Sequence, residues 1–276
     1  MSRPRDRPTR LHSRAPVSRL QRHSLAHATG PALTTLFRSS SLSVTGATAA
    51  KSDCRLMVAL MNDKGAKRGA SRPSVSDHPY VIRGLAARRA GTGVAPTRPT
   101  VDMRPDLASR LSSLFARTEH LVKAYVPTED LRALRAAQEM VSYSTYLAGD
   151  LPLFGSVAMA TDYHSACHTD QDFWYCHLTV RVSGNGDEGI ALNQQLNPPP
   201  ALAFLFPTMG VTVLLRPGDN LLFNPSVPHC CSPKYPFYDN MHVHLCSFYL
   251  SSKVVGGNDN SLSLTAEQVE FNSAAL

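Results

Sequence analysis

The spacing of apolar residues predicts two helices near the middle of the chain. Between residues 107 and 122 apolar side chains recur at intervals of three and four, which is the period of an amphipathic helix. Thr128 is a favourable N-cap, and the acidic Glu129 and Asp130 suit the positive end of a helix, so a second helix is expected to begin there. Both helices are expected to end before Gly149 and to pack their apolar stripes against a core.

Beyond Pro152 the apolar residues fall into short runs, and no further helix is indicated. The runs are rich in β-branched and aromatic residues, and Gly, Pro and Asn stand between them, as expected for strands joined by turns. Many short strands of this kind favour a β-sandwich or barrel. The expected strands cover residues 154–163, 173–182, 189–192, 201–206, 211–215, 220–223 and 242–250.

The first hundred residues differ from the rest in charge and in apolar content. Residues 1–100 contain 18 Lys and Arg against four Asp and Glu, whereas residues 101–276 contain 10 against 17. Apart from residues 56–61, they offer few apolar side chains to offset the entropy that the chain loses on ordering. We therefore expect residues 1–100 to form a basic, largely disordered N-terminal region.

The composition of residues 1–50 leaves three roles open for this basic region. It is rich in Arg and Ser and contains a single acid, Asp6, which is typical of a transit peptide for a mitochondrion or plastid. The same composition fits a solvated tail that binds nothing. A third alternative is an arm that contacts nucleic acid, because clustered arginines attract phosphate groups.

The composition also excludes two classes of protein. The longest mostly apolar stretch, residues 201–215, contains Pro207 and Gly210 and is too short to cross a bilayer, so we expect no membrane partner. Six cysteines in 276 residues are too few for a disulfide scaffold, and none stands in the C-x-x-C pair of a zinc knuckle. With 43% hydrophobic residues, the chain has enough apolar material for a soluble, packed domain.

The first candidate chemistry is the motif His168-Thr169-Asp170. Side chains at positions i and i+2 of an extended segment point to the same face, so this imidazole and carboxylate can hold one cation together. His229, after a turn, a short strand and a proline-framed bend, is the third candidate ligand. The 59 positions from Asp170 to His229 leave room for four or five strands, enough to bring His229 back beside the first two. Two His and one carboxylate are the ligands of non-haem Fe(II) oxygenases.

Taken together, His168-x-Asp170, Gly218-Asp219 and Pro228-His229 resemble the motifs of the Fe(II)/2-oxoglutarate-dependent dioxygenases, whose core is a double-stranded β-helix, or jelly roll. The second part is also similar to a motif of the cupins, which share this architecture. The resemblance covers about residues 154–250. It implies a mainly β fold, with helical support over residues 101–150, a double-stranded β-helix over residues 151–255 and a C-terminal tail over residues 256–276.

The resemblance also implies a metal and a co-substrate. His168, Asp170 and His229 would hold Fe(II), while 2-oxoglutarate and O2 would occupy the open positions. The co-substrate would be decarboxylated to succinate and CO2 as an unidentified substrate is hydroxylated. The family anchors the distal carboxylate of 2-oxoglutarate with an Arg or Lys on the final strand, but residues 242–247 here are H-V-H-L-C-S. The candidate co-substrate residues are therefore Lys234, His244, Arg181 and Tyr175.

Several alternatives stay open. A cupin-type metalloenzyme would use the same three ligands without 2-oxoglutarate, and a non-catalytic β-helix domain would bind a partner, with its basic arm contacting nucleic acid. His242 and His244 share one face of a strand and suit either a second metal site or pairing within the sheet. Cys230 and Cys231 suit a Cys–His pair or packed thiols, and Asp172 is a candidate partner for a metal ligand.

Overall fold

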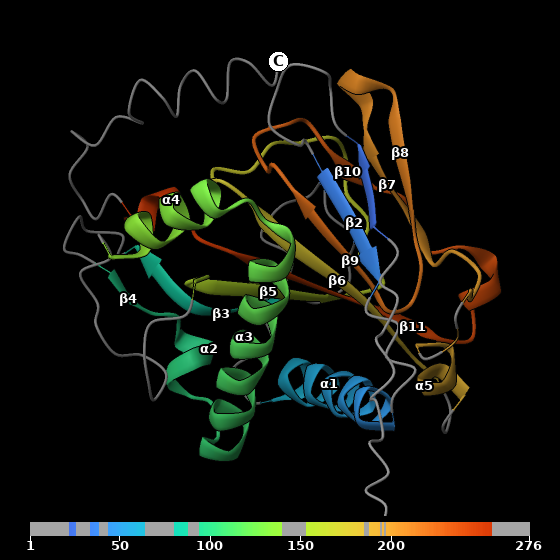
Figure 1. Cartoon of the computed structure of the whole chain (residues 1–276). Helices are drawn as coiled ribbons and strands as arrows, with labels where there is room; N and C mark the ends of the chain where they lie inside the picture. The colour runs from blue at the N-terminus through green and yellow to red at the C-terminus, as the bar shows by residue number, and fades with distance from the viewer. Residues whose placement is uncertain are drawn as a thin grey trace, which may run out of the picture.

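The computed structural model is a mainly β fold in which two sheets are backed by helices (Figure 1). It describes residues 22–25, 34–38, 44–63, 80–87, 94–139, 153–184, 188–193, 195 and 197–255. The predicted C-terminal tail, residues 256–276, lies outside these ranges. Within the described ranges, no helix is both long and apolar enough to cross a membrane.

The larger sheet has eight strands in the order β1-β2-β9-β6-β11-β5-β3-β4, and every neighbouring pair is antiparallel. Its centre is β11, which pairs with β6 on one side and β5 on the other, so that Cys246 faces both Thr179 and Met159. The strands are β1 (Arg22–Leu25), β2 (Thr34–Arg38), β3 (Tyr80–Ala87), β4 (Val94–Pro96), β5 (Ser156–Thr161), β6 (Cys176–Ser183), β9 (Asp219–Phe223) and β11 (His242–Tyr249).

A smaller sheet of three antiparallel strands lies over one face of the larger sheet. Its order is β10-β7-β8, formed by β7 (Leu202–Phe206), β8 (Val211–Leu215) and β10 (Cys230–Cys231). Side chains from both sheets share one hydrophobic core, which joins Val180 and Leu245 of the larger sheet to Phe204 of the smaller. Two sheets enclosing a common core make the sandwich that the sequence predicts.

The opposite face of the larger sheet packs against helices. Successive side chains of a strand point to opposite faces, so Cys246 and Phe248 of β11 leave the core between the sheets and join a second core with the helices. Phe115 and Phe248 meet edge to face with ring centroids 5.3 Å apart. The helices are α1 (Val44–Asn62), α2 (Arg98–Val101), α3 (Pro105–Tyr125), α4 (Thr128–Glu139), α5 (Glu188–Leu192) and α6 (Ser252–Val255), with two 3-10 turns at Pro207–Met209 and Pro236–Tyr238.

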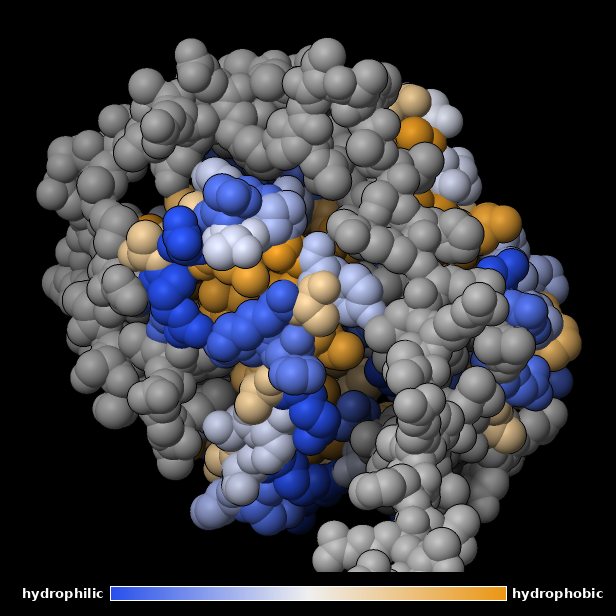
Figure 2. Space-filling model, viewed as in Figure 1, coloured by the Kyte–Doolittle hydropathy of each residue, from blue (hydrophilic) through white to orange (hydrophobic). Residues whose placement is uncertain are grey.

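The two predicted helices are present as α3 and α4. The apolar stripe of α3 is buried in the core with the sheet, whereas its outer surface carries exposed residues such as Arg110 and is largely hydrophilic in the space-filling view (Figure 2). The helix begins at Pro105, since proline fits the first turn, where its missing N–H has no partner to lose. Residues 140 and 141, predicted to extend the second helix, lie outside the described residues.

Parts of residues 1–100, the region that we expect to be largely disordered, belong to helices and strands of the structure. Leu56, Met57 and Leu60 of α1 are at most 2% exposed and pack into the core between the helices and the sheet. Strand β3 is likewise a full member of the larger sheet, paired with β5. A few apolar residues concentrated on one side of a helix are therefore enough to dock it. Most of residues 1–50, on which the transit-peptide and nucleic-acid predictions rest, lie outside the described residues.

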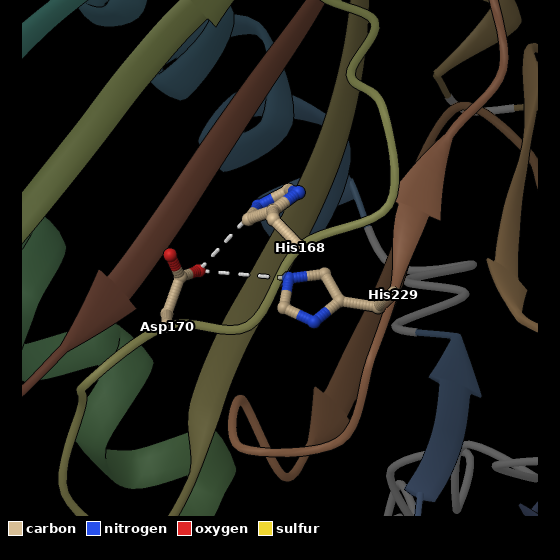
Figure 3. Close-up of side chains that lie close together, drawn as sticks. All are labelled: His168, Asp170 and His229. Carbon is tan, nitrogen blue, oxygen red and sulfur yellow. Dashed lines mark ion pairs between the residues drawn. The ribbon is translucent and has the colours of Figure 1, made fainter. Parts of the chain in front are cut away.

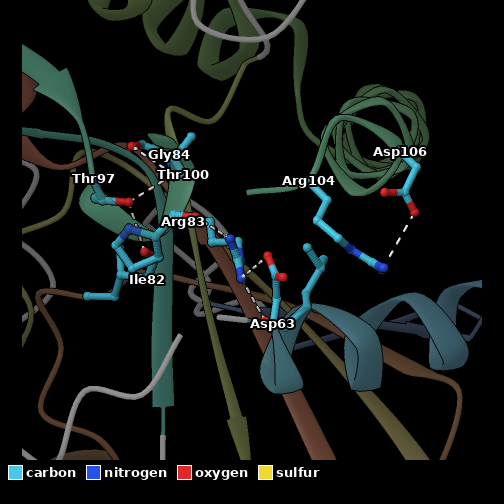
Figure 4. Close-up of polar contacts among 10 residues, drawn as sticks. Asp63, Ile82, Arg83, Gly84, Thr97, Thr100, Arg104 and Asp106 are labelled. Atoms are coloured by element: carbon cyan, nitrogen blue, oxygen red, sulfur yellow. Dashed lines mark hydrogen bonds and ion pairs between the residues drawn. The ribbon is translucent and has the colours of Figure 1, made fainter. Parts of the chain in front are cut away.

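Arg83 of β3 ties this N-terminal part to the fold (Figure 4). Its guanidinium is fully buried and donates hydrogen bonds to the carbonyls of Pro99 and Leu60 and, at 3.4 Å, to the carboxylate of Asp63. Burial lowers the pKa of Arg83, and the charge of Asp63 opposes this effect. These bonds join the end of α1 to α2 through a single side chain.

One predicted strand is a helix. Residues 189–192 belong to the short helix α5, and Asn193 after it bonds the N–H and the carbonyl of Val182 on β6 at 2.8 and 2.7 Å. An apolar run of four residues fits a buried helical turn as well as a strand, which explains the error. The other predicted strands, at residues 154–163, 173–182, 201–206, 211–215, 220–223 and 242–250, match β5, β6, β7, β8, β9 and β11 within a few residues at their ends.

Candidate metal centre

His168, Asp170 and His229 converge on one point (Figure 3). The Nε2 atoms of His168 and His229 lie 3.8 and 3.5 Å from the same carboxylate oxygen, Oδ2 of Asp170. The three potential ligand atoms all lie within 4.8 Å of one another. His168 and Asp170 come from the loop between β5 and β6, and His229 immediately precedes β10, so the fold brings together residues that are distant in sequence.

Backbone hydrogen bonds hold the two segments side by side. His168 and His229 form an isolated antiparallel bridge in which each N–H donates to the other carbonyl, at 3.0 and 2.9 Å. The N–H of Asp170 donates to the carbonyl of Pro225 at 2.9 Å. Main-chain pairing therefore fixes the backbone from which the three side chains extend.

The same local contact orients both imidazoles. Nδ1 of His168 lies 2.8 Å from the carbonyl of Ala166, and Nδ1 of His229 lies 2.8 Å from the carbonyl of Val227. A carbonyl oxygen can only accept, so Nδ1 carries the hydrogen in each ring and Nε2 of the neutral ring keeps its lone pair. Both lone pairs face Asp170, which is the orientation that metal-binding histidines require.

Aromatic residues close one side of the cluster. The ring of Phe204 stacks on His229 with centroids 5.4 Å apart and planes 13° apart, and Phe223 meets His229 edge to face at 5.1 Å. The side chain of His229 is 4% exposed, whereas those of His168 and Asp170 are 27% and 38% exposed. The cluster therefore has an apolar wall toward the core between the sheets and is open to solvent on the other side, where small molecules can enter.

A second carboxylate, Asp172, lies behind the first. Burial, together with the charge of Asp170, raises the pKa of Asp172 to about 7. The thiol of Cys176 donates to its Oδ2 at 3.6 Å, and Asp172 pairs with Ser251 in an isolated bridge. Asp172 therefore takes up a proton near neutral pH, whereas the charge of the pair stays on Asp170.

Arg181 and His244, two of the predicted co-substrate anchors, lie on the helix-covered face of the larger sheet. Arg181 alternates along β6 with Val180 and Val182, which belong to the core between the sheets, so its side chain points the other way. It lies close enough to α1 that its charge lowers the pKa of the Cys54 thiol, an effect smaller than the rise caused by burial. The sheet thus separates Arg181 from the His229 side of the core.

His244 is buried and hydrogen-bonded on this face. Its Nδ1 and Nε2 lie 3.0 and 2.7 Å from the hydroxyls of Thr161 and Ser183. Burial, reinforced by the charge of His242, lowers the pKa of His244 to about 4, so the ring is neutral near pH 7. A neutral imidazole without a free nitrogen is a poor anchor for a carboxylate.

The other two predicted co-substrate residues also have contacts elsewhere. Lys234 donates to the carbonyl of Met241 at 2.7 Å and pairs with Asp162 at 3.4 Å. Tyr175 lies in the core beneath the helices, where its hydroxyl donates to Asp130 of α4 at 3.3 Å. The structure therefore brings together the three predicted metal ligands but none of the four predicted co-substrate residues.

His242, the other histidine of the predicted pair, belongs to a polar cluster around Asp162. The carboxylate of Asp162 accepts hydrogen bonds from the N–H of Val243 at 2.8 Å and from Nδ1 of His242 at 3.0 Å. Burial alone would raise the pKa of Asp162, but these bonds and the charge of Lys234 outweigh it and lower the pKa below its usual range. His242 and His244 thus bind different partners, and the part of the chain that the structure describes has no second group of metal ligands around them.

Two imidazole nitrogens and one carboxylate oxygen, oriented in advance and exposed on one side, form a donor set that suits Fe(II) with open coordination positions. The sequence predicts these three residues as ligands, but it gives no sign of Phe204 and Phe223, which line the buried side of the site. No motif marks the two phenylalanines, since they are spaced like any core residue. The carbonyls that orient the rings each stand two residues before the histidine, a regularity visible only once the backbone is known.

Comparison with known proteins shows a likeness in structure only. No family model and no curated protein matches the sequence. Among solved structures, NgTET1 in complex with 5mC DNA has a TM-score of 0.58 and 11% identity, over 86% of this chain and 78% of that chain. A prolyl-4-hydroxylase from Pseudomonas putida has a TM-score of 0.42 and 14% identity over 79% and 92% of the two chains.

A viral collagen prolyl hydroxylase from Paramecium Bursaria Chlorella virus-1, in complex with 2-oxoglutarate, has a TM-score of 0.39 and 10% identity over 79% and 96%. Of these likenesses, the one to NgTET1 extends to the whole architecture, and at 11% identity it is a likeness of fold. The predicted double-stranded β-helix is confirmed.

Proposed function

We propose that this chain is a non-haem Fe(II)- and 2-oxoglutarate-dependent dioxygenase that hydroxylates a substrate. The observation that carries the proposal is the convergence of His168, Asp170 and His229 on one point, at the edge of the core of a double-stranded β-helix. A fold shared with NgTET1 supports it, because that architecture can hold such a site. Fold by itself does not fix activity, so the proposal rests on the three side chains.

Each residue of the site has a separate task. Nε2 of His168, Nε2 of His229 and a carboxylate oxygen of Asp170 would hold Fe(II), and the remaining positions would accept 2-oxoglutarate and O2. When bound, the iron supplies the activation of O2 that is coupled to decarboxylation of 2-oxoglutarate to succinate and CO2. The carbonyls of Ala166 and Val227 keep both rings in the ligand orientation.

The aromatic wall and the second carboxylate complete the environment. Phe204 and Phe223 exclude water from the buried side of His229 and keep the ring from turning. Asp172 stands behind Asp170 and takes up a proton near neutral pH, so the negative charge of the site is that of Asp170. The exposed side of His168 and Asp170 leaves the path by which co-substrate and substrate would enter.

A cupin-type metalloenzyme that works without 2-oxoglutarate is the second candidate. The placement of the basic residues favours it, since Arg181 is on the far face of the sheet and Lys234 is paired with Asp162. Both candidates use the same metal ligands. They differ in whether 2-oxoglutarate binds at the metal.

An anaerobic titration with Fe(II) and then 2-oxoglutarate separates the candidates. If the first proposal holds, a weak charge-transfer band appears in the visible spectrum and saturates at one 2-oxoglutarate per iron. Iron binding without the band supports the cupin-type alternative. If iron does not bind, both proposals fail, and the result supports a non-catalytic binding domain.

Matched variants assign the ligands. Asp170→Ala should abolish the band and, in aerobic solution, the release of succinate from 2-oxoglutarate. Asp239→Ala removes an exposed carboxylate outside the cluster and should leave both signals at the level of the unchanged protein. His242→Ala is the matching control for the histidines and should also leave both signals unchanged. Its side chain is 66% exposed and forms a hydrogen bond with Asp162.

A further inference from the structure

Two cysteines flank the metal centre at matching positions. Cys167 precedes His168, and Cys230 follows His229. Because His168 and His229 pair in an antiparallel bridge, the residues one step outside them along the same register also face each other, and these residues are Cys167 and Cys230. Of the six cysteines, Cys167 is exposed and Cys230 half-buried, whereas Cys54, Cys176, Cys231 and Cys246 are buried.

The pairing geometry suits a covalent link. His168 and His229 exchange both of their backbone hydrogen bonds, so the next pair is of the non-hydrogen-bonded kind, in which Cα atoms lie about 4.5 Å apart. Disulfides join Cα atoms about 4.4–6.8 Å apart, so this pair can be bridged with little movement of the backbone. Alternation places both thiols on the face opposite to the two imidazoles, and hence away from the metal.

The two segments stay side by side beyond the cysteine pair. The loop that carries Cys167 continues alongside β10, where the N–H of Ser165 donates to the carbonyl of Cys231 at 3.1 Å. Between the His168–His229 bridge and the Ser165–Cys231 bond, Ala166 and Cys167 together lie opposite the single residue Cys230, so the backbone holds Cys167 beside Cys230.

We infer that Cys167 and Cys230 form a reversible cross-strand disulfide that ties together the two segments carrying His168 and His229. Hydrogen peroxide is a sufficient oxidant. The exposed Cys167 sulfur attacks a peroxide oxygen, the O–O bond breaks with loss of water, and a sulfenic acid is left. Cys230 then attacks that sulfur and releases a second water, so two thiols lose two electrons and two protons in total, and an added dithiol reverses the step.

The disulfide would act on the metal centre through the backbone. It joins residues next to the bridge and so keeps the His168 and His229 segments from separating, with or without a bound ion. This consequence for metal retention rests on the proposed function, but formation of the disulfide does not. The two are therefore tested by different measurements.

Peptide mapping of the full chain tests the bond itself. The reduced protein is treated with hydrogen peroxide, the remaining thiols are alkylated, and the digest is analysed by mass spectrometry without reduction. The expected result is loss of two free thiols per chain and a cross-linked pair of peptides containing Cys167 and Cys230. Cys54→Ser, which replaces a buried thiol on α1, should give the same pair, whereas Cys167→Ser and Cys230→Ser should each abolish it.

Other oxidation products would overturn the inference. A disulfide between two chains through Cys167, or Cys167 and Cys230 both recovered as alkylated thiols or as separate sulfinic acids, shows that the pair does not close. Amide hydrogen exchange supplies a readout independent of activity. The amides of His168 and His229 should exchange more slowly in the oxidised metal-free protein than in the reduced one, and equal rates would show that the bond does not restrain the bridge.

Discussion

Replacing His244 with Gln should make the stability of the protein less sensitive to acid. His244 is 5% exposed and bonds the hydroxyls of Thr161 and Ser183, and burial lowers its pKa from 6.5 to about 4. The folded pKa is below the unfolded one, so between these values the unfolded chain binds more protons. The contribution of His244 to stability is therefore complete above the unfolded pKa and is lost as the pH falls toward the folded pKa.

The size of the effect follows from these two pKa values. Between about pH 7.5 and about pH 5 the difference in proton binding at His244 reduces the free energy of unfolding by ~2 kcal/mol. His244→Gln keeps groups that can bond Thr161 and Ser183 but does not titrate. The free energy of unfolding of the variant should consequently fall by about 2 kcal/mol less than that of the unchanged protein over the same interval.

Urea denaturation at the two pH values measures this difference. Because each protein is compared with itself, a general loss of stability in the variant does not affect the result. An equal decrease for both proteins would show that His244 is not buried in the neutral form. The same variant tests the corrected role of this residue, since a 2-oxoglutarate affinity that falls with His244→Gln would contradict its placement on the helix-covered face.

Three further predictions concern Phe204 beside the candidate metal site, the buried Arg83 of β3 and the arginines of residues 1–21. Because the ring of Phe204 is buried and packs on His229, Phe204→Ala should reduce the free energy of unfolding by about 3–5 kcal/mol in urea denaturation. The same variant should weaken Mn(II) binding by about 10–100-fold in calorimetry. Phe204→Leu should have a smaller effect on both measurements. Arg83→Met should cost about 3–5 kcal/mol by leaving Asp63 without its buried partner, and an unchanged urea midpoint would contradict this role. Gln at all six arginines of residues 1–21 should weaken the binding of a fluorescent oligonucleotide and flatten its salt dependence; an unchanged anisotropy curve would exclude a nucleic-acid arm there. These arginines are Arg3, Arg5, Arg7, Arg10, Arg14 and Arg19.

The sequence is most informative for features with a long period or a strict chemical requirement. Helix α3 extends over 21 residues, so its apolar pattern recurs over several helical turns and stands out clearly. The three candidate metal ligands come together in the structure, and the sequence points to them because His168 and Asp170 must share a face and His229 follows a proline-framed bend. Before the strand that leads to His229, residues 216–219 form a turn in which Gly218 adopts a φ of 92°, a value that favours glycine.

The errors arise where a side chain is buried on either face of a strand. Seven of the eight residues of β6 are buried, so alternation of polar and apolar residues does not tell which face meets the helices. The sequence therefore offers Arg181 and His244 as anchors for 2-oxoglutarate, whereas both lie on the helix-covered face of the sheet. For α1 the decisive factor is tertiary: Leu56, Met57 and Leu60 find a surface to pack against, which low overall hydrophobicity does not reveal.

X-ray diffraction from crystals soaked anaerobically with Mn(II), recorded to give anomalous differences, tests the metal centre most directly. One strong peak is expected, about 2.0–2.2 Å from Nε2 of His168, Nε2 of His229 and a carboxylate oxygen of Asp170. A strong peak at other residues, or none at this cluster in crystals that hold the metal elsewhere, would contradict the assignment of the three ligands.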